Sequence, residues 1–93
     1  RLGANLRTAR LRRNLTVEQV AAKIGTGRRA VLEAEKGKAS TSAAVYTALL
    51  WAYDLLAPMD TLADPATDTE GLALSVQRER ARATQSQALD SDF

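Results

Sequence analysis

Apolar residues recur along this chain at the spacing of an amphipathic helix rather than at the alternating spacing of a strand. Leu2, Leu6 and Ala9 follow one another at i, i+4 and i+7, which predicts a first helix that ends near residues 13–14. Strand signals are nearly absent, because there is no alternating β-branched run and no Asn-Gly or Asp-Gly turn. The pattern therefore predicts an all-α protein.

A second, short helix is predicted to begin at a capping box. The run Thr16-Val17-Glu18-Gln19 places a hydroxyl at the N-cap and a glutamine at N3, where each satisfies a backbone N–H that lacks a partner in the helix. Val20 and Ile24 form the buried stripe of this helix. Gly25 is expected to end the helix, because glycine adopts a left-handed conformation without strain.

A third helix is predicted after a turn of three residues. It runs from Arg28 to Lys36, with Gly27 as its N-cap and Gly37 after its end. Val31 and Ala34 are its buried positions. Two short helices joined by such a turn are typical of a helix-turn-helix motif, which here covers about residues 16–36.

The pattern changes in the C-terminal half. Residues 40–42 offer three N-caps for a fourth helix that reaches to about Leu56 and is apolar most of the way round, which predicts burial on two sides. A short fifth helix is expected from Pro58 onward. A second capping box at residues 67–70 predicts a helix to residue 82.

These elements predict three segments. Residues 1–57 form the helix-turn-helix domain and residues 58–82 form a C-terminal helical extension. Residues 83–93 are mostly small and polar, which predicts a disordered tail.

Composition excludes most kinds of catalytic site. The chain of 93 residues has no cysteine and no histidine, which removes thiolate ligands, disulfides and the commonest general base. We therefore expect no enzymatic activity, no cofactor and no metal site. No apolar run approaches the length of a membrane span, and we expect a cytoplasmic protein.

Charge is divided sharply between the two halves. Residues 1–38 carry ten Lys and Arg against three Glu, a net charge of +7, whereas residues 39–93 carry three Arg against eight acids, a net charge of −5. Such asymmetry indicates that the basic half meets a polyanion and that the acidic half has another role.

The third helix has the character of a helix that reads DNA. Its arginines stand at its N-terminal end, where base edges are reached in the major groove, and an arginine fork matches the O6 and N7 acceptors of guanine. Gly27 leaves backbone N–H groups open to a phosphate. The outward face is predicted to consist of Arg28, Arg29, Leu32, Glu33 and Lys36.

With these residues in view, the chain resembles the Cro/repressor-like (Xre) helix-turn-helix family over roughly residues 1–56. The shared pattern is Leu15-Thr16-x-Glu18-x-Val20-Ala21-x-x-Ile24-Gly25, followed by Val31, Glu35 and Gly37. The resemblance implies a compact lambda-repressor-like bundle of about five helices, here with an extra C-terminal helix.

The resemblance also implies roles for single residues. Arg10 pairs with Glu35 as a structural pair between the first helix and the end of the recognition helix. Val17 departs from the glutamine common at its position, where a side-chain amide would make a polar contact. The implied DNA-binding residues are Thr16, Val17, Thr26, Gly27, Arg28, Arg29, Leu32, Glu33, Lys36 and Lys38.

A second resemblance concerns the C-terminal half, which looks like that of HipB-type antitoxins. It implies an autorepressing antitoxin of a toxin-antitoxin operon that binds a HipA-like serine/threonine kinase toxin. Two alternatives stay open: a stand-alone phage-like or housekeeping repressor with no toxin partner, and an adaptor that binds protein rather than DNA.

Surplus apolar residues in and after the fourth helix predict a homodimer on double-stranded DNA with a palindromic operator. The predicted dimer or partner surface consists of Tyr46, Leu50, Trp51, Tyr53, Met59 and Leu62.

Plainer interpretations exist for the charged residues of the third helix. Glu33 stands four residues after Arg29 and could pair with it on the helix surface. Arg28 and Arg29 oppose the helix dipole at an N-terminus, so some other partner must favour them, and we expect this partner to be DNA.

Overall fold

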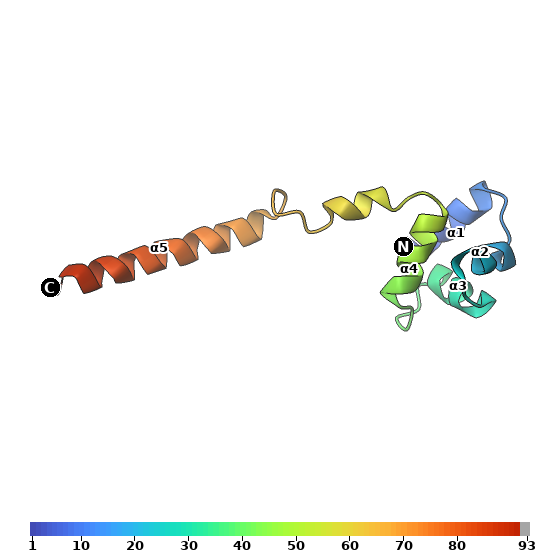
Figure 1. The fold of residues 1–93 in the computed structure, drawn as a ribbon, viewed down its shortest axis with the longest axis horizontal. Helices are drawn as coiled ribbons and strands as arrows, with labels where there is room; N and C mark the ends of the chain where they lie inside the picture. Colours follow the sequence, from blue (N-terminus) through green and yellow to red (C-terminus); the bar gives the residue numbers. More distant parts are fainter. Residues whose placement is uncertain (92–93) are drawn as a thin grey trace. The chain divides into compact units, whose positions relative to one another are not determined.

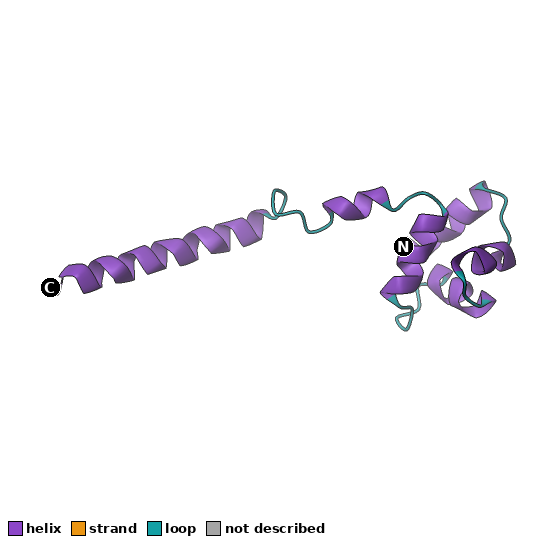
Figure 2. Cartoon of the chain, viewed as in Figure 1, coloured by secondary structure: helices purple, strands orange, loops and turns teal. Residues whose placement is uncertain are grey.

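The computed structural model describes the backbone of residues 1–91 and the side chains of residues 1–86. The described residues form helices and loops and no strand (Figures 1 and 2), which confirms the predicted all-α fold. The helices are α1 (Leu2–Arg12), α2 (Val17–Ile24), α3 (Arg28–Glu35), α4 (Ala43–Ala52), the 3-10 helix η1 (Ala57–Thr61) and α5 (Thr69–Ser91). The chain divides into an N-terminal unit, Arg1–Met59, and a C-terminal unit that begins at Asp60.

The core of the N-terminal unit lies around α3, which packs against α1, α2 and α4. Val31 and Ala34 of α3 are completely buried, as is Leu49 of α4. Burial of a valine or leucine contributes about 1.5–3 kcal/mol, so the apolar side of α3 fixes its orientation. The buried core residues are Leu6, Ala9, Val17, Val20, Ala21, Val31, Ala34, Leu49, Ala52 and Tyr53.

The predicted capping box begins α2. The Gln19 backbone N–H donates to Thr16 Oγ1 at 3.1 Å, and the Thr16 backbone N–H donates to Gln19 Oε1 at 2.9 Å. At the other end, Gly25 is left-handed with φ 73°, as predicted. Local hydrogen bonding therefore sets both ends of α2.

All four α-helices of the N-terminal unit end in the same way, at a left-handed residue. The residues are Asn14, Gly25, Gly37 and Asp54, with φ between 55° and 73°. The N–H of the next residue then donates to a carbonyl five positions back, from Leu15 to Arg10, Thr26 to Ala21, Lys38 to Glu33 and Leu55 to Leu50. This is the Schellman arrangement, which satisfies carbonyls at a helix end.

Gly3 permits a close approach of α1 to α3, which the pattern of apolar residues did not predict. A Cβ at this position would collide with the backbone carbonyls of Ala34 and Glu35. Since backbone cannot move aside as a side chain can, glycine is required where the start of α1 crosses the end of α3.

Three predictions about α4 and the residue that follows it are wrong. The helix ends at Ala52 rather than near Leu56, because Asp54 takes the left-handed conformation. Tyr53, predicted at a dimer or partner surface, is 1% exposed and belongs to the core. The N-terminal unit also covers one side of α4 rather than two, and Trp51 is 58% exposed.

The C-terminal unit corrects two further predictions. Asp68, not Thr67, caps α5, because Asp68 Oδ1 accepts from the Gly71 backbone N–H at 2.9 Å. The predicted disordered tail is wrong over residues 83–91, where α5 continues to Ser91, and residues 92–93 lie outside the described residues. Residues 72–91 contain neither glycine nor proline and are rich in alanine, arginine and glutamine, which favour a helix. Among the described helices, none is both long and apolar enough to cross a membrane.

Tyr53 gives a prediction about stability and pH. Its hydroxyl is buried and makes no hydrogen bond to a described residue, and burial raises the pKa of this phenol above 10.0. An acid whose pKa is raised by folding stabilises the fold below its unfolded pKa and loses this contribution as the pH rises through about 10. We expect Tyr53→Phe to keep or raise the free energy of unfolding at pH 7, and to reduce its decline above about pH 10.

Urea denaturation at pH 7 and at a pH above about 10 measures this effect. Tyr46→Phe in α4 is the matched control for loss of a phenol. A loss of more than about 1 kcal/mol from Tyr53→Phe at pH 7 would show that the hydroxyl has a partner, since an intramolecular hydrogen bond contributes about that amount.

Candidate nucleic-acid interface

The exposed side of α3 and its C-cap carry several of the residues that the sequence assigned to DNA. Gly27 is the N-cap with an extended backbone, and Arg28 and Arg29 follow as exposed residues of the first turn. Because Val31 and Ala34 are buried on the opposite side, these arginines point away from the core. We call the exposed side of α3 the recognition face, formed by Arg28, Arg29, Glu33 and Lys36.

The structure brings Arg10 and Glu35 together as the predicted structural pair. Arg10 Nε donates to Glu35 Oε2 at 2.8 Å and Arg10 Nη2 donates to Oε1 at 3.1 Å. The third nitrogen, Nη1, donates to the Leu15 carbonyl at 2.9 Å. The side chains of Arg10 and Glu35 are 10% and 5% exposed, and their hydrogen bonds raise the pKa of the Arg10 guanidinium. This pair joins α1 to the end of α3 and so positions the recognition face.

Each arginine at the start of α3 lies beside a carboxylate. Arg28 Nε is 2.9 Å from Oε1 of Glu18 in α2, and Arg29 Nε donates to Glu33 Oε1 at 3.2 Å. The pair of Arg29 and Glu33 is the one that their spacing of four residues allowed on the helix surface. Glu18 was not among the predicted site residues, because its neighbour is set by the crossing of two helices rather than by spacing along one.

The remaining predicted DNA contacts divide into exposed and buried residues. Lys36 and Lys38 are exposed at the end of α3, and Thr16 is exposed at the start of α2. The prediction for Val17 is wrong, because Val17 is buried in the core; Leu32 is half-buried and packs against this core. Both are apolar residues of amphipathic helices, and the contacts of their side chains with the core stabilise the motif. Thr26 is half-buried in the turn, whereas Gly27 is exposed.

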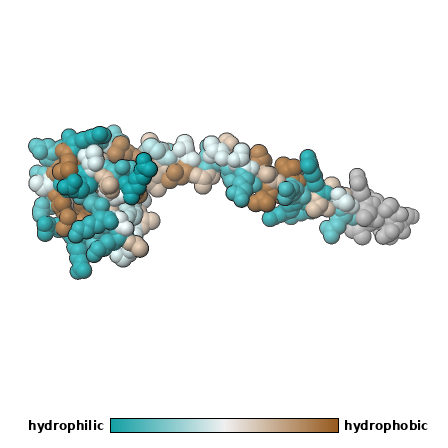
Figure 3. Space-filling view, turned by 180° about the vertical axis from the view of Figure 1, so that it is seen from behind, coloured by the Kyte–Doolittle hydropathy of each residue, from teal (hydrophilic) through white to brown (hydrophobic). Residues whose placement is uncertain are grey.

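The predicted dimer or partner surface is also divided. Trp51, Met59 and Leu62 are exposed, at 58%, 38% and 67% respectively. Tyr46 and Leu50 are half-buried and pack against the core. Figure 3 shows hydrophobic residues at the surface among hydrophilic ones in both units.

Two basic residues that the sequence left unassigned stabilise the end of α4. Arg13 Nη2 donates to the Tyr53 carbonyl at 2.8 Å, and its guanidinium lies 5.6 Å from the centre of that ring. Lys23 Nζ donates to the Ala52 carbonyl at 3.3 Å and lies 5.8 Å from the centre of the Trp51 ring. A basic residue near the end of a helix is the sequence signal that could have indicated such a contact. The signal does not identify the partner, which depends on the tertiary fold.

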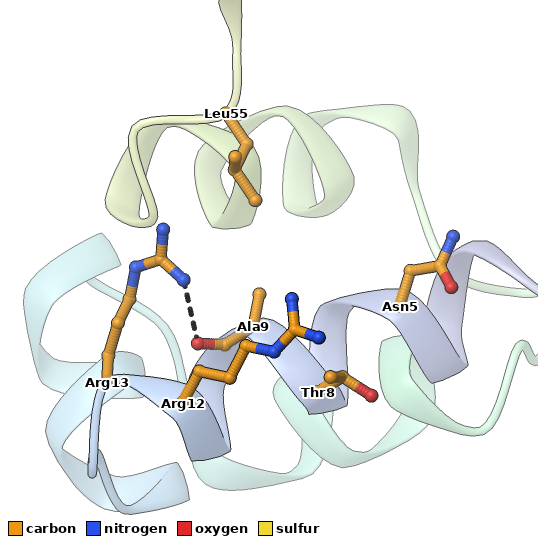
Figure 4. A pocket seen from close by; sticks show the side chains of 6 residues that line it. All are labelled: Asn5, Thr8, Ala9, Arg12, Arg13 and Leu55. Carbon is orange, nitrogen blue, oxygen red and sulfur yellow. Dashed lines mark hydrogen bonds between the residues drawn. The ribbon is translucent and has the colours of Figure 1, made fainter.

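A pocket of about 350 Å³ lies between α1 and the segment after α4 (Figure 4). It shares no residue with the predicted DNA contacts. In Figure 4, Leu55 faces α1 from the segment after α4, and Arg13 donates to the Ala9 carbonyl at 2.9 Å. Its lining consists of Asn5, Thr8, Ala9, Arg12, Arg13 and Leu55. Within the described part of the chain, no cluster of acidic, histidine or cysteine side chains suits a metal ion.

Comparison with known proteins agrees with this geometry. A family model described as a helix-turn-helix domain matches residues 1–62, about two thirds of the chain. Searches of curated proteins and of solved structures give no match.

Proposed function

The chain belongs to the helix-turn-helix domain family, and on this premise we propose that it is a sequence-specific DNA-binding repressor. The observation that carries the proposal is the pair of exposed arginines in the first turn of α3. Two cations there oppose the helix dipole, which costs a few tenths of a kcal/mol each. Besides Glu18 and Glu33, guanine or phosphate at this end of α3 offsets the cost, and the net charge of +7 on residues 1–38 attracts the phosphate backbone.

The exposed basic residues divide into two classes. Arg28 and Arg29 lie at the end of α3 that enters the major groove, so we assign them to base edges. Lys36 and Lys38 lie at the opposite end, and we assign them to phosphates. Phosphate contacts fix the register of the protein on the duplex, whereas contacts to base edges supply the sequence preference.

This division gives a testable contrast between two single variants. Arg29→Ala should cost about 1–3 kcal/mol on the operator and remove the preference at one base pair. Lys38→Ala should weaken binding to all sequences about equally. Affinities on operator and singly substituted duplexes measure both effects. Identical changes from the two variants on every duplex would refute the division.

We further propose that the protein acts as a homodimer on a palindromic operator. The support is the apolar surface that the N-terminal unit leaves exposed in and after α4, where Trp51, Leu55 and Met59 are 58%, 41% and 38% exposed. One α3 reads only a few base pairs, so a useful preference requires two half-sites.

Selection of duplexes from a randomised pool by the full chain tests the function and the dimer together. The expected product is a palindrome whose half-sites lie one helical turn apart, about 34–36 Å, or a multiple of this distance. Enrichment of a single, non-repeated half-site would contradict the dimer. Absence of any enriched sequence would contradict the function.

A finer role, as the antitoxin partner of a HipA-like kinase toxin, rests on the C-terminal unit. Leu72, Leu74 and Val76 of α5 are 61%, 58% and 37% exposed, and the net charge of −5 on residues 39–93 suits a basic protein surface better than DNA. A stand-alone repressor would not need this surface. Retention of such a kinase by the full chain, and its loss after truncation at Asp64, would support the antitoxin role; equal retention by both would contradict it.

A further inference from the structure

Both arginines of the recognition face are approached by a carboxylate through the same nitrogen. Glu18 Oε1 lies 2.9 Å from Arg28 Nε, and Glu33 Oε1 lies 3.2 Å from Arg29 Nε. The two carboxylates come from different places, since Glu18 is in the first turn of α2 and Glu33 is one turn along α3. An ion pair between Nε and a carboxylate is therefore formed twice by independent routes, and in the Arg29–Glu33 pair it is also a hydrogen bond.

The choice of Nε matters for what each arginine can still bind. A guanidinium carries five N–H donors in a planar fork, one of them on Nε. A carboxylate beside Nε leaves the end of the fork, formed by the two terminal amino groups, directed outward. This end matches the neighbouring O6 and N7 acceptors of guanine with two parallel hydrogen bonds.

We infer that Glu18 and Glu33 are positioning residues that hold Arg28 and Arg29 for bidentate contacts to two guanines in each operator half-site. The inference rests on the proposed function and deepens it by naming the base that each arginine reads. An exposed arginine has several rotatable bonds, so a carboxylate that restricts it lowers the entropy lost when it meets a base.

The two carboxylates differ in exposure, whereas the side chains of Arg28 and Arg29 are both exposed, at 65% and 88%. The Glu33 side chain is 26% exposed and lines a pocket of about 170 Å³ between α3 and the start of α4, together with Ser40 and Thr41. Glu18 is 65% exposed, but it lies in the first turn of α2, where the helix dipole favours an anion. Each carboxylate therefore has a reason to stay in place that does not depend on the arginine beside it.

The two pairs also affect binding to unrelated DNA. Each arginine is accompanied by one negative charge close to the surface that meets the phosphates. The pairs therefore add little to the electrostatic attraction that every sequence shares. An arginine held in this way contributes mainly where a guanine completes its hydrogen bonds, which raises the ratio of specific to non-specific affinity.

A purely structural role makes a different prediction. If the carboxylates served only to offset two cations at the start of α3, their removal would lower thermal stability and leave the preference among bases unchanged. It would also raise the affinity for all duplexes alike, because a negative charge is lost. The ratio of affinities separates the two roles.

The test uses the full chain and the operator that it selects. Arg28→Ala and Arg29→Ala first identify the base pair that each arginine reads, as the position where the preference disappears. We expect a G·C pair at both positions. Glu18→Gln should then lower the preference at the Arg28 position about tenfold, which is 1.4 kcal/mol, and Glu33→Gln should do so at the Arg29 position.

Two further variants complete the experiment. Glu79→Gln in α5 makes the same change of charge in the C-terminal unit and should leave every preference unchanged. Glu18→Gln added to Arg28→Ala should lower the preference no further than Arg28→Ala alone, because a positioning residue acts through its arginine.

The outcomes separate the inference from the proposed function. If the full chain prefers its operator but the Glu→Gln variants keep the whole preference, the inference is wrong and the function stands. An A·T pair at both mapped positions would overturn the inference as well. If the full chain shows no preference among duplexes, the proposed function fails and the inference fails with it.

Discussion

Glu35→Gln is expected to lower the free energy of unfolding by about 3–5 kcal/mol, since this is the usual cost of breaking a buried ion pair by removing one partner. The side chains of Arg10 and Glu35 are 10% and 5% exposed, and Arg10 is held by two hydrogen bonds to the carboxylate. Glutamine keeps the shape of the side chain but removes the charge, so the arginine charge stays buried without its counter-ion. Urea or thermal denaturation of the full chain measures the loss.

Two other variants separate the buried charge from other causes. The double variant Arg10→Met with Glu35→Leu removes both charges, and its stability should be close to that of the natural chain or above it. Glu79→Gln, in α5, should change stability by less than about 0.5 kcal/mol, as an exposed substitution does. A loss below about 1 kcal/mol from Glu35→Gln, the range of exposed pairs, would mean that the pair is solvated.

Affinity for the operator should fall about 10³–10⁵-fold between 50 and 200 mM salt if a dimer neutralises about 6–10 phosphates. The physical cause is the release of condensed counter-ions from DNA by the exposed lysines and arginines of the basic half. Fluorescence anisotropy over a series of salt concentrations measures the slope of log affinity against log salt.

Single variants show how much individual residues contribute to this slope. Lys38→Ala should reduce its magnitude by about one, because one phosphate contact is lost. Arg29→Ala should reduce it less, since Arg29 is paired with Glu33 and is assigned to a base. A flat plot for the natural chain would contradict phosphate-dominated binding, and equal slopes in both variants would contradict the assignment of Arg29.

The sequence predicted a helix end correctly where a specific local signal, such as a glycine or a capping box, marks it. Gly25 and Gly37 marked two ends correctly, and the capping box at Thr16 marked a start. Asp54 adopts the same left-handed conformation, but aspartate also occurs in helices and in turns of other kinds. For this reason the end of α4 was placed too late.

Contacts between helices could be predicted only in part. The Arg10–Glu35 pair followed from the resemblance, and apolar spacing placed Val31 and Ala34 in the core. The spacing of apolar residues does not, however, predict which helices pack against one another. The burial of Tyr53 and the Glu18–Arg28 pair both depend on how two helices cross.

The C-terminal helix shows the limit of composition as a guide. Small polar residues at 83–91 predicted disorder, because they cannot bury enough apolar surface to form a core. A single helix needs no core, and alanine, arginine and glutamine favour it locally. The polar composition therefore did not exclude a helix, and α5 continues to Ser91.

Sequence-specific binding by the recognition face is tested most directly by a ratio of two affinities. The affinity of the full chain for its selected operator, divided by its affinity for a scrambled duplex of the same length and composition, is measured at about 150 mM salt. We predict a ratio of about 10³ or more, as for other specific DNA-binding proteins. A ratio near one would contradict the proposed function.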